Sequence, residues 1–222
     1  PNPDLGPERS ESVELGARYT GDIFSLEMVG FKAEYEDFIS QQVIGGSFTP
    51  FDPAVFQFVN FDQVEIDGFE AKATMKLDSG VHGRLALAYA NGDIIAPDGS
   101  RTPLDTIDPF NLVASLGYRD PSDRFGFDAI LTYNARKEAS EVERAADGAE
   151  LFVRPDAFAI LDNTAFVEVT DAIKLRAGVF NLFDETYAYW SGVRGLSVDD
   201  AGIFDAFTRP GTNFSLSASV QF

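Results

Sequence analysis

Apolar and polar residues alternate along most of this chain with a period of two. The alternation is clearest in "SVELGARYT" at 12–20, "FNLVASLGYR" at 110–119, "RFGFDAILTYN" at 124–134 and "FSLSASVQF" at 214–222. Successive side chains of a β-strand point to opposite faces, so each stretch predicts a strand with one apolar and one polar face. Val113, an apolar residue on a polar face, is an exception.

The pattern predicts nine strands, joined by connections that alternate in length. The strands are placed at 9–20, 23–36, 62–77, 84–91, 110–119, 124–135, 156–169, 173–183 and 212–222. The short connections, such as "DPSD" at 120–123, consist of turn-forming residues, whereas 37–61, 92–109, 136–155 and 184–211 are long. Short turns at one rim and long loops at the other are typical of an outer-membrane barrel. The sequence therefore predicts an all-β fold, an antiparallel up-and-down transmembrane β-barrel.

The two faces of these strands differ in the way that a membrane barrel requires. Tyr19, Tyr89, Tyr118 and Tyr133 stand near strand ends in the apolar register, where aromatic rings border the hydrocarbon. The opposite faces carry charged side chains that suit a wet lumen: Glu14, Arg18, Glu70, Lys72, Lys76, Lys174 and Arg176. A soluble β-sandwich with one solvated face is the alternative. Strands of about ten residues favour the barrel, because soluble strands are usually nearer five or six.

The composition excludes several function classes. Among the 222 residues there is no Cys and one His, His82, and the formal net charge is −19. Disulfides, zinc clusters and thiol nucleophiles are therefore excluded, and so large an acidic excess argues against binding nucleic acid. No nucleophile with a base and no carboxylate pair is placed for catalysis, so we expect neither an enzyme, nor a covalently bound cofactor, nor a metal site.

Two C-terminal stretches carry a family resemblance. They are "VFNLFDETYAYWSGVRGL" at 179–196 and "FTRPGTNFSLSASVQF" at 207–222. Both resemble the C-terminus of TonB-dependent outer-membrane receptors, and "YWSGVRGL" resembles the haem and haemoglobin receptor branch. "NPDLGPERSESVELGARY" at 2–19 is similar to the segment that opens the last part of these barrels, so the resemblance covers nearly the whole chain.

The resemblance implies a plugged barrel of 22 strands in the bacterial outer membrane, coupled to TonB. Nine strands are a part of it, since single-chain bacterial barrels have even strand counts. We expect residues 1–222 to be the C-terminal portion, with plug, TonB-binding segment and earlier strands encoded upstream of Pro1. The partners implied are outer-membrane lipid, the rest of the receptor, TonB through that missing part, and host haemoproteins.

The function implied is active uptake of haem or iron, with haem as the transported ligand. A receptor for a siderophore or another nutrient is the alternative within the superfamily. A passive channel agrees less well with the "NLFD" and "RPG" boxes.

Short motifs supply further expectations. "NPDL", formed by Asn2, Pro3, Asp4 and Leu5, resembles the N-P-N-L box of haem receptors, whose haem-ligating His would lie upstream of this chain. The alternating C-terminal strand resembles the signal for barrel insertion, carried here by Phe214, Leu216, Ala218, Val220 and Phe222.

The last long loop holds the candidate ligand-binding residues Tyr187, Tyr189, Trp190 and Arg194. Aromatic rings can stack on a porphyrin, a Tyr can ligate haem iron, and an Arg can pair with a propionate. The alternative is that these residues brace the loop. His82 falls in "DSGVHG", which we read as a solvated turn at the periplasmic rim and not as a haem ligand.

Overall fold

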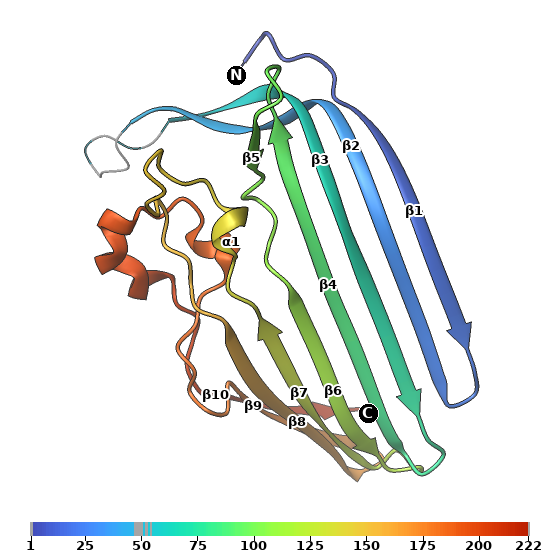
Figure 1. Ribbon diagram of the computed structural model, residues 1–222. Helices are drawn as coiled ribbons and strands as arrows, with labels where there is room; N and C mark the ends of the chain where they lie inside the picture. The colour runs from blue at the N-terminus through green and yellow to red at the C-terminus, as the bar shows by residue number, and fades with distance from the viewer. Residues whose placement is uncertain (1, 47–50, 52, 54, 222) are drawn as a thin grey trace.

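One antiparallel sheet dominates the computed structural model, which describes residues 2–46, 51, 53 and 55–221 (Figure 1). The strands are β1 (Arg9–Thr20), β2 (Phe24–Gly45), β3 (Val55–Lys76), β4 (Val81–Ile95), β5 (Arg101–Pro103), β6 (Asn111–Arg119), β7 (Phe125–Asn134), β8 (Phe158–Thr170), β9 (Ile173–Phe180) and β10 (Asn213–Val220); the helical segments are η1 (Ala139–Glu141), α1 (Trp190–Val193) and η2 (Val198–Phe207). The order across the sheet is β1-β2-β3-β4-β6-β7-β8-β9-β10, with β5 beside β4. Apart from the short β5, each strand thus pairs with the strands that precede and follow it in the chain, which confirms the up-and-down topology.

The nine predicted strands all form, but two loops were predicted wrongly. Residues 37–61 were expected to be a long loop, yet β2 continues to Gly45 and pairs with β3 as far out as Val55. This segment is rich in aromatic and β-branched residues, which favour strands. The connection at 92–109 was also expected to be a long loop. In the structure β4 runs to Ile95, and one turn leads to β5, which pairs with β4.

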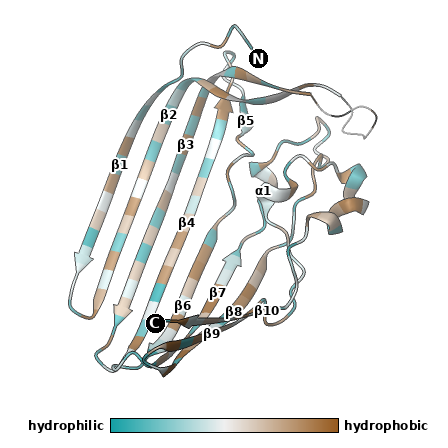
Figure 2. Ribbon diagram, turned by 180° about the vertical axis from the view of Figure 1, so that it is seen from behind, coloured by the Kyte–Doolittle hydropathy of each residue, from teal (hydrophilic) through white to brown (hydrophobic). Residues whose placement is uncertain are grey.

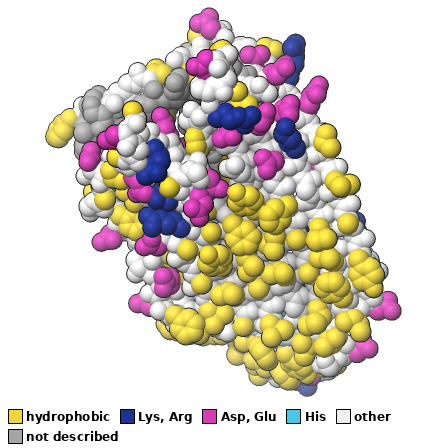
Figure 3. All heavy atoms as spheres, viewed as in Figure 1, with side chains coloured by type: hydrophobic (Ala, Val, Ile, Leu, Met, Phe, Trp, Pro, Cys, Tyr) yellow, Lys and Arg dark blue, Asp and Glu magenta, His cyan; other side chains and the backbone are white. Residues whose placement is uncertain are grey.

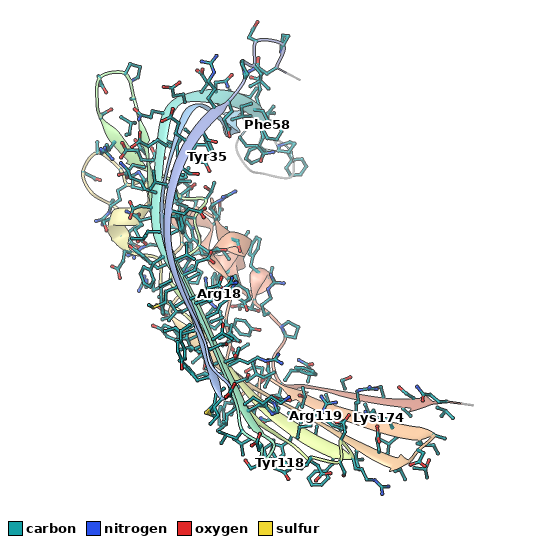
Figure 4. The ribbon with its side chains drawn as sticks, turned by 90° about the vertical axis from the view of Figure 1, so that its right-hand side faces the viewer. Arg18, Tyr35, Phe58, Tyr118, Arg119 and Lys174 are labelled. Atoms are coloured by element: carbon teal, nitrogen blue, oxygen red, sulfur yellow. The ribbon has the colours of Figure 1, made fainter. Side chains whose placement is uncertain are left out.

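The sheet is curved and open. Figure 4 shows its concave and convex sides, and β1 and β10 form its two ends. Within the described residues these two strands do not pair with each other, so each keeps one free edge. An open, curved, up-and-down sheet is what a part of a larger barrel looks like, and it confirms the fold class.

The pairing register places the predicted apolar residues on one face. Met28, Ala71, Leu87, Leu112 and Tyr133 lie opposite one another in a row that crosses β2, β3, β4, β6 and β7. Directly opposed residues of antiparallel strands project to the same side. Figure 2 shows the alternation along β1–β4, and Figure 3 shows apolar side chains gathered over the lower part of the convex face. The convex face therefore carries an apolar band suited to lipid.

Aromatic residues border this band at both ends. Near the short turns, the ring centroids of Tyr19 and Phe24 lie 6.5 Å apart, and those of Tyr118 and Phe125 lie 5.8 Å apart. Near the long loops, the ring centroids of Phe69 and Tyr89 lie 5.8 Å apart, and those of Phe110 and Tyr133 lie 6.3 Å apart. Two aromatic girdles are typical of outer-membrane barrels. Among the described residues no helix has the length and apolar character needed to span a membrane.

The concave face carries the charged side chains that the sequence placed in the lumen. Arg18 and Lys174 point to this side (Figure 4), and Arg18 pairs with Glu27 of β2 at 2.7 Å. His82 also lies on this face. The prediction of a solvated turn was wrong for it, because β4 begins at Val81 and the imidazole bonds to Asp128.

Candidate functional site

The long loops above β6–β9 pack together into an apolar cluster. Its fully or nearly buried members come from three loops and from the start of β8: Leu104, Val142, Phe158, Ala188, Trp190 and Val193. Among the described residues they form most of the buried apolar side chains of the chain. The loops therefore hold one another in place, and they position the candidate ligand-binding residues.

Trp190 is buried in this cluster. It is 3% exposed, and its indole Nε1 donates a hydrogen bond to the carbonyl oxygen of Asp105 at 2.6 Å. Asp105 belongs to the connection between β5 and β6, so the bond ties the last loop to a loop far away in sequence. This placement supports the bracing role that was the alternative for Trp190.

Tyr187 and Tyr189 are brought together around Phe158. The centroid of the Phe158 ring lies 4.5 Å from that of Tyr187 and 5.2 Å from that of Tyr189. Burial raises the pKa of Tyr187 above its ordinary value of 10.0. The guanidinium of Arg209 stands over the Tyr189 ring, 5.5 Å from its centroid. Both tyrosines are half-exposed, so this cluster keeps one side open.

Arg209 was missed in the sequence, although the "RPG" box contained it. Its backbone N–H also donates to the carbonyl of Tyr187 at 2.8 Å. Arg194, the predicted partner for a propionate, is exposed, and its charge lies near Asp105. Burial raises the pKa of the Asp105 carboxyl, and Arg194 and Lys137 partly offset that shift.

A buried charge pair lies within the loop between β7 and β8. The side chain of Lys137 is 1% exposed, and its Nζ lies 3.6 Å from Glu141 Oε2. The other carboxylate oxygen of Glu141 accepts a hydrogen bond from the Tyr89 hydroxyl at 3.2 Å. Arg154 donates to the Lys137 carbonyl at 2.7 Å. The spacing of Lys137 and Glu141 is visible in the sequence, but nothing there indicates their burial.

The N-P-N-L-like box lies against the outer end of the β2–β3 hairpin. Asn2 donates from Nδ2 to the Phe58 carbonyl at 2.9 Å and accepts from the Asp4 N–H at 3.1 Å, which closes a turn over Pro3 and Asp4. Leu5 follows and is 36% exposed. The box therefore anchors the chain to this hairpin.

The predicted insertion signal continues the apolar band. Phe214, Leu216, Ala218 and Val220 pair with apolar residues of β9, and all four are exposed on the sheet. Phe222, the last predicted member, lies outside the described residues. The role of this strand in insertion stays a prediction.

A curved sheet with an apolar convex band, two aromatic girdles and a charged concave face defines an outer-membrane β-barrel protein. Residues 1–182 match the family described as TonB dependent receptor-like, beta-barrel. The chain belongs to this family, whose members are transporters and receptors of the bacterial outer membrane.

Individual relatives agree with this assignment. The chain is 28% identical, over its whole length, to Hemoglobin-haptoglobin utilization protein B of Neisseria meningitidis serogroup A, of which it covers 31%. It is 27% identical to a Probable hemoglobin and hemoglobin-haptoglobin-binding protein 4 of Haemophilus influenzae, of which it covers 25%. In fold it is similar to the Copper transporter OprC, with a TM-score of 0.75, 22% identity, and coverage of 99% of this chain and 32% of that one. The chain thus spans between a quarter and a third of the length of these relatives.

Proposed function

We propose that this chain is the C-terminal wall of a TonB-dependent receptor that imports haem, or its iron, taken from haemoproteins. The observation that carries the proposal is similarity along the whole chain, loops included, to a haemoglobin–haptoglobin utilization protein. The apolar convex band supports contact between this wall and lipid, and TonB would act through segments outside this chain.

The half-exposed tyrosine cluster is the part of this chain best suited to a porphyrin. Tyr189 offers a phenol and an aromatic face, and Arg209 holds its ring from one side. A phenol can ligate ferric haem, and an exposed Arg such as Arg194 can pair with a propionate. Trp190 follows Tyr189 in the chain and ties this loop to the connection between β5 and β6 through its bond to Asp105.

Growth on haem tests the proposal. A strain of the native host that lacks the gene receives the full-length gene, either wild type or with Tyr189→Phe or Arg194→Gln, and grows with haemin as its iron source. We expect the wild type to restore growth in a TonB-dependent manner and both variants to lower haemin uptake. Arg136→Gln is the control, because Arg136 is also an exposed loop residue and pairs with Asp156.

A siderophore receptor is the alternative within the family. Restored growth on ferric siderophores, without growth on haemin, would replace haem by a siderophore as the ligand.

A further inference from the structure

The β2–β3 hairpin extends far above the apolar band and forms an arm. We define the arm as residues 37–46 and 55–61, with Phe51 at its end. It bends toward the concave side, above the long loops (Figures 1 and 4). Asp37, the first residue of the arm, has a φ of 54°, which lies in the left-handed region.

The arm is held firmly at its base. Asn60 on β3 donates from Nδ2 to the carbonyls of Asp37 and Gly6, at 2.6 Å and 3.2 Å, and accepts from the Gly6 N–H at 2.8 Å. The Ile39 N–H donates to the carboxylate of Glu8 at 2.8 Å. Together with the bond from Asn2 to the Phe58 carbonyl, these contacts fix the arm to the N-terminal segment. A surface ordered in advance loses less entropy on binding.

The surface of the arm is apolar and almost uncharged. Between Phe38 and Phe61 the sequence has a single charged residue, Asp52, although 24% of the chain is charged. Exposed fractions are 53% for Ile44, 100% for Phe51, 50% for Val55 and 51% for Phe58. Aromatic enrichment and depletion of charge mark the centres of protein–protein interfaces.

Lipid does not explain these apolar residues. On the convex face, the residue pairs beyond the upper girdle are charged, with Lys32 opposite Asp67 and Glu34 opposite Glu65. The arm lies beyond this charged zone. It is also a projecting ribbon, whereas sites for small molecules are concave.

Charge restricts the partner further. Acidic residues outnumber basic ones in each of the loops at 96–110, 135–157 and 181–212. A second copy of this receptor would bring two acidic surfaces together, and like charges repel. The complementary partner has an apolar contact patch with basic residues around it.

We propose that the arm is the docking surface for an extracellular folded protein with an apolar contact patch and a basic rim. The identity of the partner rests on the proposed function: it is the haemoprotein from which the receptor takes haem. Phe58, which Figure 4 shows on the concave side, then anchors the partner above the mouth of the barrel.

Binding of haemoglobin to the full-length receptor in outer-membrane vesicles tests the proposal. The variant combines Val55→Ser with Phe58→Ser. The matched control is Ile203→Ser, because Ile203 on η2 is 55% exposed and lies outside the arm. Heat-modifiable migration on gels verifies that every barrel is folded.

We expect the double variant to raise the Kd for haemoglobin about tenfold or more, since buried aromatic anchors dominate interfaces. We expect the Kd of the control variant to stay within about twofold of the wild-type value. Uptake of free haemin by the double variant should stay unchanged, and haemoglobin binding by the wild type should weaken as the salt concentration rises. The proposal is overturned if the double variant binds haemoglobin as the wild type does. It is also overturned if the double variant loses uptake of free haemin to the same extent as haemoglobin binding, or if the wild-type receptor binds no haemoglobin. If the double variant loses self-association but still binds haemoglobin, the arm is an interface between two copies of the receptor, and the proposal is overturned as well. Failure of wild-type growth on haemin would instead refute the proposed function, while the haemoglobin binding assay still decides the role of the arm.

Discussion

The imidazole Nε2 of His82 lies 2.8 Å from Oδ1 of Asp128, although β6 runs between their strands. Gly117 is the residue of β6 that stands directly between them in the register. A Cβ at Gly117 would collide with both atoms. The absence of that one carbon lets a side chain on β4 bond to a side chain on β7 across the concave wall.

The first prediction is that Gly117→Ala separates His82 from Asp128. We expect a loss of about 1–3 kcal/mol in the free energy of unfolding, as for other overpacked sites. Urea unfolding of the full-length receptor in liposomes measures it. Gly30→Ala is the control, since the nearest atom to an added Cβ there is the Gly68 carbonyl oxygen at 3.9 Å. Adding His82→Ala to Gly117→Ala should restore part of the loss; no recovery would contradict the steric explanation.

The second prediction concerns the lipid face. Leu116 projects from the convex side of β6, opposite Ala129, which lies midway along the outward row of β7. Leu116→Arg should destabilise the barrel by about 2–4 kcal/mol near the bilayer midplane. Ser115→Arg, which points to the concave side, should cost much less. Equal losses in the same unfolding assay would show that the two faces are assigned wrongly.

The third prediction concerns the buried pair in the loops. Glu141→Gln leaves the Lys137 ammonium without its carboxylate, and breaking a buried ion pair in this way costs on the order of 3–5 kcal/mol. We expect the loop at 135–157 to become sensitive to limited proteolysis. Glu143→Gln is the matched control, because Glu143 is exposed. Resistance of the Glu141 variant equal to that of the control would rule out a bracing role for the pair.

The fourth prediction is a pH dependence of the same loop. Burial lowers the pKa of Lys137 below its ordinary value of 10.5, with Glu141, Asp105 and Asp108 opposing the shift and the Tyr89 hydroxyl nearby. The unfolded loop then binds more protons than the folded one between the lowered pKa and 10.5, so stability rises with pH in that window. In this pH window, proteolysis of the wild-type loop should slow as pH rises, when its rate is divided by the rate for Lys137→Met at the same pH. If the ratio of the two proteolysis rates stays constant, Lys137 does not titrate in this window.

The fifth prediction concerns the base of the arm. Asn60→Ala removes the hydrogen bonds to Gly6 and Asp37, each worth about 1 kcal/mol. The Gly6 amide should exchange its hydrogen at least about tenfold faster, as measured by mass spectrometry. Asn213→Ala, which loses a local bond to the Gly211 carbonyl at 3.0 Å, should leave that exchange rate unchanged.

The sequence predicted the strands of the membrane band because lipid and lumen impose a strict period of two. Along β10, for example, Phe214 and Leu216 alternate with Ser215 and Ser217. The arm was missed because lipid no longer imposes that period above the band, so apolar neighbours such as Phe38 and Ile39 follow one another. His82 was placed in a turn because its partner, Asp128, is remote in sequence.

The candidate site was predicted only in part. Tyr187 and Tyr189 could be proposed from their motif, whereas Phe158 and Arg209, which hold them, come from other elements. Trp190 illustrates the limit most clearly. A loop tryptophan in a sequence can be a ligand platform or a brace, and only the tertiary contact with Asp105 favours the brace.

The convex face changes from apolar to charged within a single step of the register. Phe69 and Tyr89 of the upper girdle are followed by Asp67 and Asn91, with Lys32 beside them on β2. Sinking the wall by one step would immerse these groups in hydrocarbon, and the cost rises with depth for every charged group. The depth of immersion of the receptor is therefore fixed to about one residue pair. Since β2 and β3 run without interruption from the band into the arm, the same balance sets the height of the arm above the cell surface.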